Sequence, residues 1–347
     1  MSKQKKILFL SRYYYPHIGG VERHVKEISK ILIRKGFKIT LVTDYFNQNL
    51  KSEQLYGNIK VIRISYPEIK YVGLFILWFK LLKYIRLIAN SDIVHVHDVF
   101  IWYLPFKLLF PRKKIFTTFH GYESFPVRKK NIIIRRFSEV LSTGSICIGE
   151  FMKKWYGHRP NFVSYGGVDV EKFRRMKKAK KVEKEYNAIF SGRLDDQTGI
   201  LTYLKAIELL RKSGVKFSWI VLGDGKYFNN VKLSANAKGF VRDPNKFYHM
   251  SKYAFVSRYL AILEAFASKR MVFAVYDNPL KKDYLSMTPF SKWIIIEESP
   301  YKLAQKIKVY MENPNLGAKN VDEAYEWVKD QSWEVLVNVY TKLWELS

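Results

Sequence analysis

The sequence predicts an α/β protein with two β/α/β domains, and four observations indicate this fold. The apolar run at residues 7–10 leads into a loop with Gly19 and Gly20, and a helical stretch follows. The apolar run at 188–190 leads into Ser191-Gly192-Arg193 before a second helical stretch. Short apolar runs alternate with helical stretches along the whole chain, which is typical of parallel sheets covered by helices. Finally, the 347 residues exceed the roughly 250–300 at which a single core stops growing.

In the N-terminal half, apolar runs of five or six residues predict the strands of a parallel sheet. We expect them near residues 6–11, 38–43, 59–64, 92–97, 114–119, 145–149 and 161–165. Between the first two strands, apolar residues from Val21 to Leu32 follow the spacing of a helix. Gly36 should end this helix, because glycine readily adopts the left-handed conformation of a helix C-terminus.

The charge run at residues 171–185 has no apolar periodicity, which is typical of a linker. We therefore predict a first domain over residues 1–168, a linker over 169–185 and a second domain over 186–320. In the second domain, strands are expected near residues 187–191, 217–222, 237–241, 253–256, 271–275 and 293–296. Residues 321–347 are helical by pattern, and we expect this segment to cross back to the first domain.

Composition narrows the class of protein. The single Cys147 excludes a disulfide scaffold or a cysteine metal site and predicts a reducing compartment. The apolar run near the N-terminus is too short for a signal peptide, so a cytoplasmic location is expected. The formal charge of +29 is uneven, since residues 1–170 hold 29 basic and 11 acidic residues. Such a charge attracts anionic lipids, phosphorylated substrates or nucleic acid, but no nucleic-acid-binding module is recognisable, so we expect no nucleic acid partner.

Gly19 and Gly20 come directly before a helix, where unpaired N–H groups and the helix dipole favour a phosphate or carboxylate. A plain turn is the alternative. The fingerprint G-x-G-x-x-G is absent here, and no P-loop sequence occurs in the chain, so neither motif supports nucleotide binding.

Three features of the second half follow predicted strands or open an apolar segment: Gly192-Arg193-Leu194, Gly223-Asp224-Gly225 and Glu264. In a parallel sheet, the carboxyl ends of the strands share one edge, where open α/β folds bind ligands. An arginine there can neutralise a diphosphate, and a carboxylate can accept hydrogen bonds from ribose hydroxyls. A surface ion pair for Arg193 and a helix-start role for Glu264 stay open as alternatives.

Seven motifs in order resemble those of the family-4 retaining glycosyltransferases of GT-B fold, and the resemblance covers nearly the whole chain. The motifs are Tyr15-Pro16-His17-Ile18-Gly19-Gly20-Val21-Glu22-Arg23-His24, Asp92-Ile93-Val94-His95-Val96-His97, Thr118-Phe119-His120-Gly121, Gly166-Gly167-Val168-Asp169, Ser191-Gly192-Arg193-Leu194, Gly223-Asp224-Gly225 and Leu263-Glu264-Ala265-Phe266. The resemblance implies two Rossmann-like domains facing across a cleft. It also implies transfer of a sugar, with retained configuration, from a nucleotide diphosphate donor to an acceptor held by the N-terminal domain.

The resemblance also implies roles for individual residues. His120, which would contact the donor sugar, and Arg193, which would neutralise the diphosphate, are the expected catalytic residues. The implied donor-binding residues are Gly19, Gly20, Arg193, Thr198, Gly223, Gly225, Val241, Arg258, Leu260, Ala261 and Glu264. The implied acceptor-binding residues are Glu22, His24, Gly121, Tyr122 and Glu123. No metal site or tightly bound cofactor is expected, because cations and N–H donors of the chain can stabilise the leaving diphosphate. UDP-hexose is the first donor expected and GDP-mannose the second.

Two departures from the family pattern stand out. Thr198 occupies the position of a lysine that shares the diphosphate charge, and the loop at residues 257–263 is shortened and lacks the first carboxylate of the E-x7-E motif. One hypothesis is that Arg258 or Lys226 supplies the missing positive charge, while the alternative is that both are ordinary surface cations. Loss of turnover, leaving a binding or scaffold subunit, is the other interpretation.

The expected acceptor is a glycan or a lipid-linked molecule. Residues 122–136 combine a basic cluster with an apolar run, and residues 71–89 are apolar, with Lys80, Lys83 and Arg86 on one face of a predicted helix. These segments could seat the protein on the anionic inner face of the cell membrane. The alternative is that 71–89 is simply a sheet-covering helix. His24, His95 and His97, beside or within buried strands, are also expected to have structural hydrogen bonds.

Overall fold

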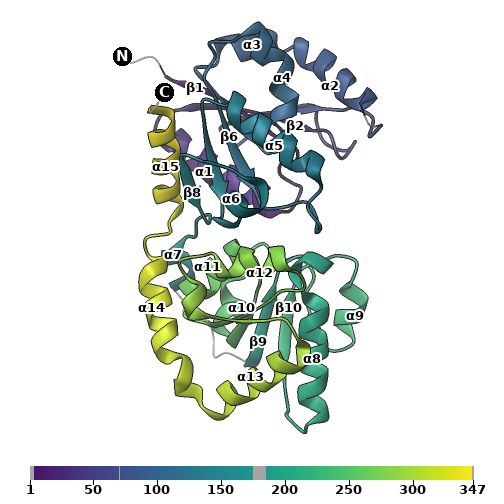
Figure 1. Cartoon of the computed structure of the whole chain (residues 1–347), viewed down its shortest axis with the longest axis vertical. Coiled ribbons are helices and arrows are strands. Elements are labelled where there is room, and N and C mark those ends of the chain that lie inside the picture. The colour runs from purple at the N-terminus through teal and green to yellow at the C-terminus, as the bar shows by residue number, and fades with distance from the viewer. Residues whose placement is uncertain (1–3, 70, 175–184, 346–347) are drawn as a thin grey trace. The chain divides into compact units, whose positions relative to one another are not determined.

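The computed structural model describes residues 4–69, 71–174 and 185–345 (Figure 1). The chain forms two compact units: Met1–Ser164 with Trp333–Ser347, and Tyr165–Ser332. Most of the predicted linker lies outside the described residues. Its first part forms the short helix α7 (Val170–Arg174).

The first unit contains an eight-stranded sheet with the order β3-β4-β2-β1-β5-β6-β7-β8. The strands are β1 (Lys6–Ser11), β2 (Lys38–Asp44), β3 (Glu53–Tyr56), β4 (Ile59–Ile64), β5 (Ile93–His97), β6 (Ile115–His120), β7 (Gly144–Ile148) and β8 (Phe162–Ser164). All neighbours pair in parallel except β3, which is antiparallel to β4. The seven predicted strands are confirmed. The sequence did not reveal β3, because this edge strand is at most half-buried and has no apolar run.

Helices cover both faces of this sheet (Figure 1). They are α1 (Gly20–Arg34), α2 (Val72–Leu82), α3 (Ile85–Asn90), α4 (Phe100–Leu109), α5 (Lys129–Leu141), α6 (Phe151–Tyr156) and α15 (Trp333–Glu345). Helices α2, α3 and α4 bury apolar side chains against one face, which includes Val94 and Val96 of β5. Because strand side chains alternate, His95 and His97 point to the opposite face, where α1 and α15 pack together. Helix α1 ends before Gly36, which has φ +88° as predicted.

The prediction of one helix over 71–89 is wrong. Helix α2 ends at Leu82 and α3 begins at Ile85. At the break, the backbone N–H groups of Lys83 and Tyr84 donate to carbonyls only three residues earlier, and the Tyr84 ring packs into the core of this face. The change of hydrogen-bond pattern means that Lys80, Lys83 and Arg86 do not share one face of a continuous helix.

The second unit contains a six-stranded sheet, all parallel, with the order β11-β10-β9-β12-β13-β14. The strands are β9 (Tyr186–Ser191), β10 (Trp219–Leu222), β11 (Asn236–Ala237), β12 (Ser251–Phe255), β13 (Met271–Val275) and β14 (Ile294–Glu297). The strand expected at 237–241 has only two residues, because the backbone turns at Gly239, which has φ +67°. The other five expected strands are confirmed.

The helices of this unit, besides α7, are α8 (Ile200–Lys212), α9 (Phe228–Lys232), α10 (Asn245–His249), α11 (Tyr259–Ala267), α12 (Pro279–Ser286), α13 (Pro300–Glu312) and α14 (Ala318–Val328). Short 3₁₀ turns lie at η1 (Asp196–Thr198), η2 (Ser291–Trp293) and η3 (Pro314–Gly317). Helices α8 and α13 pack over buried aromatic residues of the sheet, including Phe190 and Phe255. The helical segment expected at 321–347 is two helices: α14 belongs to the second unit and α15 to the first. In the part of the chain that the structure describes, no helix is long and apolar enough to cross a membrane.

Candidate functional site

The predicted donor-binding residues of the second unit gather at one edge of its sheet. All six strands run in parallel, so their carboxyl ends lie together. Arg193 follows β9, Gly223 and Gly225 follow β10, and Arg258 follows β12. This is the edge at which ligands bind to open parallel sheets.

Two glycines bring the loops after β9 and β10 into direct backbone contact. A Cβ atom at Gly223 would lie 1.8 Å from the carbonyl oxygen of Gly192, and one at Gly225 would lie 2.7 Å from that of Leu194. Both glycines have positive φ, +150° and +147°. The N–H of Leu194 donates to the Asp224 carbonyl at 2.9 Å. Packing therefore requires these glycines, whatever their role toward a ligand.

Arg193 is exposed at this edge, with 60% of its side chain accessible. Its Nε lies 3.2 Å from Asp195 Oδ2, which orients the guanidinium without burying it. Thr198 is buried, and its hydroxyl lies 2.8 Å from the carbonyl oxygens of both Arg193 and Asp195. Thr198 thus holds the Arg193 loop in shape and brings no charge in place of the family's lysine.

The two candidate replacement cations lie in different surroundings. The guanidinium of Arg258 donates to Gln197 Oε1, beside Thr198, and lies 5.6 Å from the centre of the Tyr284 ring. Lys226 is exposed and pairs with Asp196 Oδ2. Arg258 therefore contacts the loop from which the lysine is missing, whereas the charge of Lys226 is partly offset by a carboxylate.

The remaining predicted donor residues lie on α11 or after β11. Glu264 is only 2% exposed, and its Oε2 accepts a hydrogen bond of 3.4 Å from the hydroxyl of Tyr248. The same hydroxyl is 3.2 Å from the Ala261 carbonyl. Leu260 is half-buried against Gly166, and Val241 is half-buried in irregular backbone. The structure thus places Glu264 in the interior of the unit, with its carboxylate bonded to a tyrosine.

In the first unit, the predicted glycine loop lies at the start of α1. Gly19 has an extended backbone, and a Cβ atom there would lie 2.2 Å from Glu22 Oε2. The other carboxylate oxygen, Oε1, is 2.7 Å from Nδ1 of His17. Glu22 therefore folds back over the first turn, where its negative charge complements the helix dipole.

A buried hydrogen-bond network joins α15 to the sheet and to α1. Trp344 Nε1 can only donate, and it lies 3.0 Å from His95 Nδ1, so His95 carries its proton on Nε2 and donates to Thr118 Oγ1 at 2.8 Å. The Tyr340 hydroxyl is 2.8 Å from both Thr118 Oγ1 and His24 Nε2. Burial lowers the pKa of His24 to about 3, so this network is uncharged. The structural hydrogen bonds expected for His24 and His95 are present.

His120 lies at the carboxyl end of β6 and is half-buried. Its Nε2 is 2.9 Å from His97 Nδ1, and its backbone N–H donates to Asp98 Oδ1 at 2.9 Å. Burial lowers the pKa of His120 well below its usual range, and the nearby His24 acts in the same direction. His120 can therefore offer a neutral ring nitrogen at physiological pH. The following Gly121 has φ +67°, which turns the chain away from the strand.

The predicted acceptor residues after Gly121 are held in place by side chains of α5 and α6. Glu123 Oε1 accepts a hydrogen bond of 2.8 Å from Arg135 Nε, and Oε2 accepts one of 2.8 Å from the Tyr156 hydroxyl. Tyr122 is half-buried, with its ring centre 6.1 Å from that of Phe151. The carboxylate of Glu123 is thus engaged within the unit.

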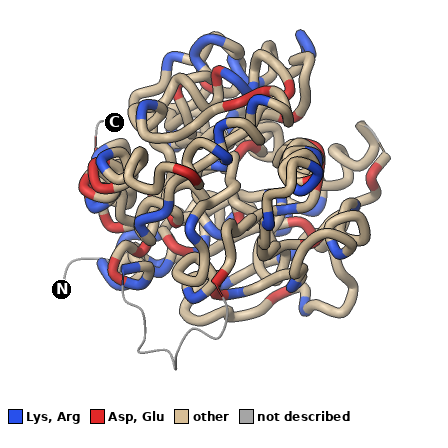
Figure 2. The backbone as a smooth tube through the Cα atoms, turned by 90° about the horizontal axis from the view of Figure 1, so that it is seen from below, with Lys and Arg blue, Asp and Glu red and all other residues tan. Residues whose placement is uncertain are grey.

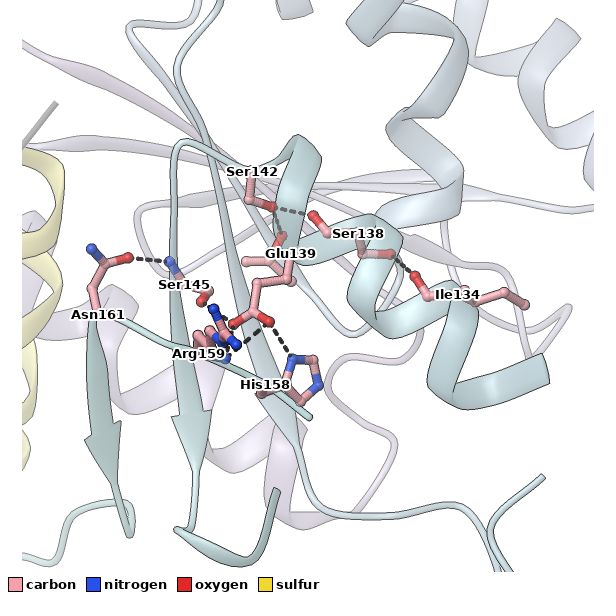
Figure 3. Close-up of polar contacts among 9 residues, drawn as sticks. Ile134, Ser138, Glu139, Ser142, Ser145, His158, Arg159 and Asn161 are labelled. Atoms are coloured by element: carbon pink, nitrogen blue, oxygen red, sulfur yellow. Dashed lines mark hydrogen bonds and ion pairs between the residues drawn. The ribbon is translucent and has the colours of Figure 1, made fainter. Parts of the chain in front are cut away.

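A second carboxylate cluster, centred on Glu139, was not predicted from the sequence; Figure 3 shows it between α5 and the edge of the sheet. Glu139 Oε2 is 2.9 Å from His158 Nδ1, and its carboxylate also accepts from the Arg159 N–H and the Ser145 hydroxyl. Burial acts to raise the pKa of Glu139, but these hydrogen bonds outweigh it and hold the pKa below its usual range. The cluster fixes the inner side of α5 to β7 and to the segment before β8. Its members are too far apart in sequence to form a motif.

Sequence reasoning also missed Lys281, which is buried in the first turn of α12. Its Nζ donates to the carbonyl of Ser257, in the loop after β12. The available signal was Asn278-Pro279, a helix start that directly follows a predicted strand and so lies at the ligand-binding edge. Within the described ranges, no group of three or more His, Cys, Asp or Glu is placed to hold a metal ion.

The Tyr340 network yields a stability prediction. Replacing Tyr340 with Phe should destabilise the first unit by about 1–3 kcal/mol, because buried His24 and Thr118 would lose a partner. The matched control is Tyr103→Phe, since the buried Tyr103 hydroxyl has no hydrogen-bond partner among the described residues and should tolerate removal. Urea unfolding of both variants measures the difference. Equal destabilisation by the two substitutions would show that the Tyr340 hydrogen bonds do not contribute to the stability of the first unit.

Two α/β units, one with a wholly parallel sheet and one with a sheet that is parallel except at β3, form a fold similar to that of GT-B glycosyltransferases. Residues 18–172 match the family model described as Glycosyltransferase Family 4, and residues 171–327 match Glycosyl transferases group 1. The chain therefore belongs to the family-4, group-1 glycosyltransferases. This membership confirms the resemblance, the fold class and the enzyme class predicted from the sequence.

Alignments with similar proteins span nearly the whole chain. An uncharacterised glycosyltransferase of Methanocaldococcus jannaschii is 23% identical over 393 residues, covering 99% of each chain. The structure of sucrose-phosphate synthase from Thermosynechococcus elongatus superposes with a TM-score of 0.75 at 14% identity, covering 99% of this chain and 100% of that one. WaaG, a glycosyltransferase involved in lipopolysaccharide biosynthesis, has a TM-score of 0.65 at 11% identity, with coverages of 96% and 98%. At these identities, the structures establish the fold alone, and the roles of individual residues stay predictions.

Proposed function

We propose that the protein is a retaining hexosyltransferase. It transfers a hexose from a nucleotide diphosphate sugar, UDP-hexose first and GDP-mannose second, to a glycan or lipid-linked acceptor at the inner face of the cell membrane. The observation that carries this proposal is the exposed Arg193 at the carboxyl edge of the second sheet, beside the glycine loops after β9 and β10.

The chemistry explains why that position matters. Cleavage of the bond between sugar and phosphate leaves negative charge on the diphosphate, and a preorganised cation stabilises that charge as it develops. Arg193 offers two parallel N–H donors to phosphate oxygens, and Arg258 adds positive charge beside the same loop. In the first unit, the neutral His120 serves as a hydrogen-bonding group for a sugar hydroxyl.

A panel of nucleotide sugars tests the proposal. UDP-glucose, UDP-N-acetylglucosamine, UDP-galactose and GDP-mannose are each added to the protein, and the Tm and donor hydrolysis are measured. At least one donor should raise the Tm and be hydrolysed with retained anomeric configuration. If none of a broad panel changes the Tm, the proposed function is wrong.

Thr198 favours a second candidate function. Because the family's lysine is missing there, a protein that binds a nucleotide sugar without turnover, as a binding or scaffold subunit, is consistent with the same site. In the panel, this candidate predicts a raised Tm without hydrolysis or transfer.

The membrane location is supported by apolar side chains that lie uncovered on the outer sides of α2 and α5. The connections from β4 to β5 and from β6 to β7 run in the same direction across a parallel sheet, so both helices lie on one face (Figure 1). The exposed apolar residues are Val72, Phe75, Phe79 and Leu82 on α2, and Ile133, Ile134, Phe137 and Val140 on α5. Such a surface, next to exposed basic residues, fits the interface of an anionic bilayer.

Charge supports the same location. Lys129, Lys130 and Arg136 are exposed on α5 beside the apolar residues. Figure 2 shows Lys and Arg distributed over many helices and loops, with fewer Asp and Glu between them. The Glu139 cluster holds α5 by its inner side, so its apolar side stays outward (Figure 3). Basic residues near an anionic surface contribute about 1 kcal/mol each.

Vesicle flotation tests this location. Replacing Phe79 and Phe137 together with Glu should weaken binding to vesicles with anionic lipid at least about tenfold, because two aromatic side chains would no longer enter the interface. The control is Leu233→Glu, which changes an even more exposed apolar residue, in the second unit. Binding of the wild-type protein should weaken at high salt. Unchanged flotation of the double variant would remove this surface from the proposal.

A further inference from the structure

Lys281 lies at the predicted diphosphate edge and has no assigned role. The side chain of Asn278 caps α12 by accepting a hydrogen bond of 2.8 Å from the Lys281 N–H, which places Lys281 in the first turn after β13. Lys281 is 2% exposed. Its Nζ donates to the Ser257 carbonyl and lies 4.3 Å from the centre of the Tyr284 ring. The amine therefore sits between the carboxyl ends of β12 and β13.

The loop that lacks the family's lysine packs against the same place. A Cβ atom at Gly199 would lie 2.2 Å from Val275 Cγ2, at the end of β13. Gln197, from the same loop, accepts a hydrogen bond from Arg258, the residue after Ser257. Lys281 is thus connected to the Thr198 loop through Ser257, which accepts its hydrogen bond, and through the adjacent Arg258, which bonds to Gln197.

The carboxylates near Lys281 do not offset the cost of a positive charge on its buried amine. Arg258, from the start of α11, is a like charge, whereas Asp277 after β13 and Asp195 after β9 attract it from a distance. Tyr284 of α12 and Tyr259 of α11 are the other titratable groups, with rings stacked 4.0 Å apart. Within the residues that the structure describes, no carboxylate forms an ion pair with Lys281. Burial first, and then Arg258, lower the pKa of Lys281 well below its usual range.

We propose that Lys281 is the second cation of the diphosphate site, replacing the lysine absent at Thr198, and that its amine takes up one proton from solvent when a nucleotide diphosphate sugar binds. This inference rests on the proposed function. The lone pair of Nζ accepts the proton, and no other bond forms or breaks. A buried cation near an arginine is unfavourable alone, but two negative phosphates at the strand ends favour the ammonium form.

The sign of the pH dependence follows from this step. Bound diphosphate raises the pKa of Lys281, so at any pH between the free and bound values the complex holds more protons than its separated components. Affinity for the donor should therefore fall as pH rises through that interval, by up to tenfold per pH unit. Below the interval, Lys281 is charged in both states and proton uptake vanishes.

Isothermal titration calorimetry tests the proposal with UDP-glucose and, separately, GDP-mannose as probes. Phosphate and Tris differ in ionisation enthalpy. If up to one proton is taken up per site, titrations at pH 8 in the two buffers should give apparent binding enthalpies that differ by up to the difference between the two ionisation enthalpies. Lys281→Met should abolish that difference and weaken binding about tenfold or more. Lys281→Arg, which stays charged, should bind without proton uptake. The matched control is Lys282→Met, which removes the exposed neighbouring lysine and should behave as wild type.

Thermal unfolding provides a readout that does not depend on activity. Without nucleotide sugar, Lys281→Met should raise the Tm by about 2 °C or more, because a buried amine is replaced by an apolar chain of similar length. With nucleotide sugar, the same variant should gain less Tm than wild type. Tight binding without proton uptake, or wild-type affinity of Lys281→Met, overturns the role of Lys281 and leaves the proposed function standing. Failure of every nucleotide sugar to bind overturns both.

Discussion

Replacement of Arg193 with alanine should lower kcat/KM for the nucleotide-sugar donor by about 10²–10³-fold, the usual loss when a preorganised group that stabilises developing charge is removed. The guanidinium stands exposed at the end of β9, and the contact between Asp195 Oδ2 and Arg193 Nε orients it. Its charge acts on the departing diphosphate, so kcat should fall as well as donor affinity. Steady-state kinetics with the donor found in the nucleotide-sugar panel measures both.

Arg193→Lys should recover part of the activity, because a point charge remains while the paired donors are lost. The matched control is Arg34→Ala, which removes an arginine of similar exposure whose Nη2 lies 3.3 Å from a carboxylate oxygen of Glu334. That variant should keep wild-type kinetics. An Arg193→Ala enzyme with unchanged kcat/KM would show that the diphosphate does not bind at the end of β9.

Replacement of Gly223 with alanine should destabilise the second unit by about 3 kcal/mol or more, because overpacking and an unfavourable positive φ act together. The new Cβ would lie 1.8 Å from the Gly192 carbonyl oxygen, and backbone on both sides leaves little room for relief. The Tm of this unit should fall by roughly 6–12 °C. Thermal unfolding followed by circular dichroism measures the change.

Gly214→Ala separates the two causes. Gly214 also has a positive φ, +83°, but a Cβ atom there would meet nothing within 4 Å. Only the conformational penalty of about 1–2 kcal/mol should appear. Equal losses in both variants would show that the contact between the loops after β9 and β10 does not limit stability.

Most strands could be predicted because a buried parallel strand needs a continuous apolar run, as residues 7–10 and 271–275 illustrate. Where tertiary contacts set the structure, prediction failed. Edge strand β3 has no apolar run, and the helix expected at 71–89 breaks where Tyr84 turns into the core. The strand expected at 237–241 is cut short at Gly239, whose positive φ is not visible in a hydrophobic pattern.

For the candidate site, Arg193 and the glycines at strand ends could be found because strand direction in a parallel sheet fixes where such residues gather. The donor and acceptor roles of these residues stay predictions. Lys281 was missed because its importance depends on burial and on Ser257 and Arg258, which precede it by more than twenty positions. The Glu139 cluster was missed for the same reason.

The order of residues alone specified the two parallel α/β sheets, the glycosyltransferase class and the arginine at the end of β9, because these depend on local apolar patterns and on short motifs. Folding in three dimensions decided which polar groups are exposed and which are charged. In the folded chain, the side chain of Arg193 is exposed, whereas Glu264 and Lys281 are buried. Burial under α15 also keeps His24 neutral. Burial and the arrangement of neighbouring charges control ionisation, and both are properties of segments that meet only in the folded chain.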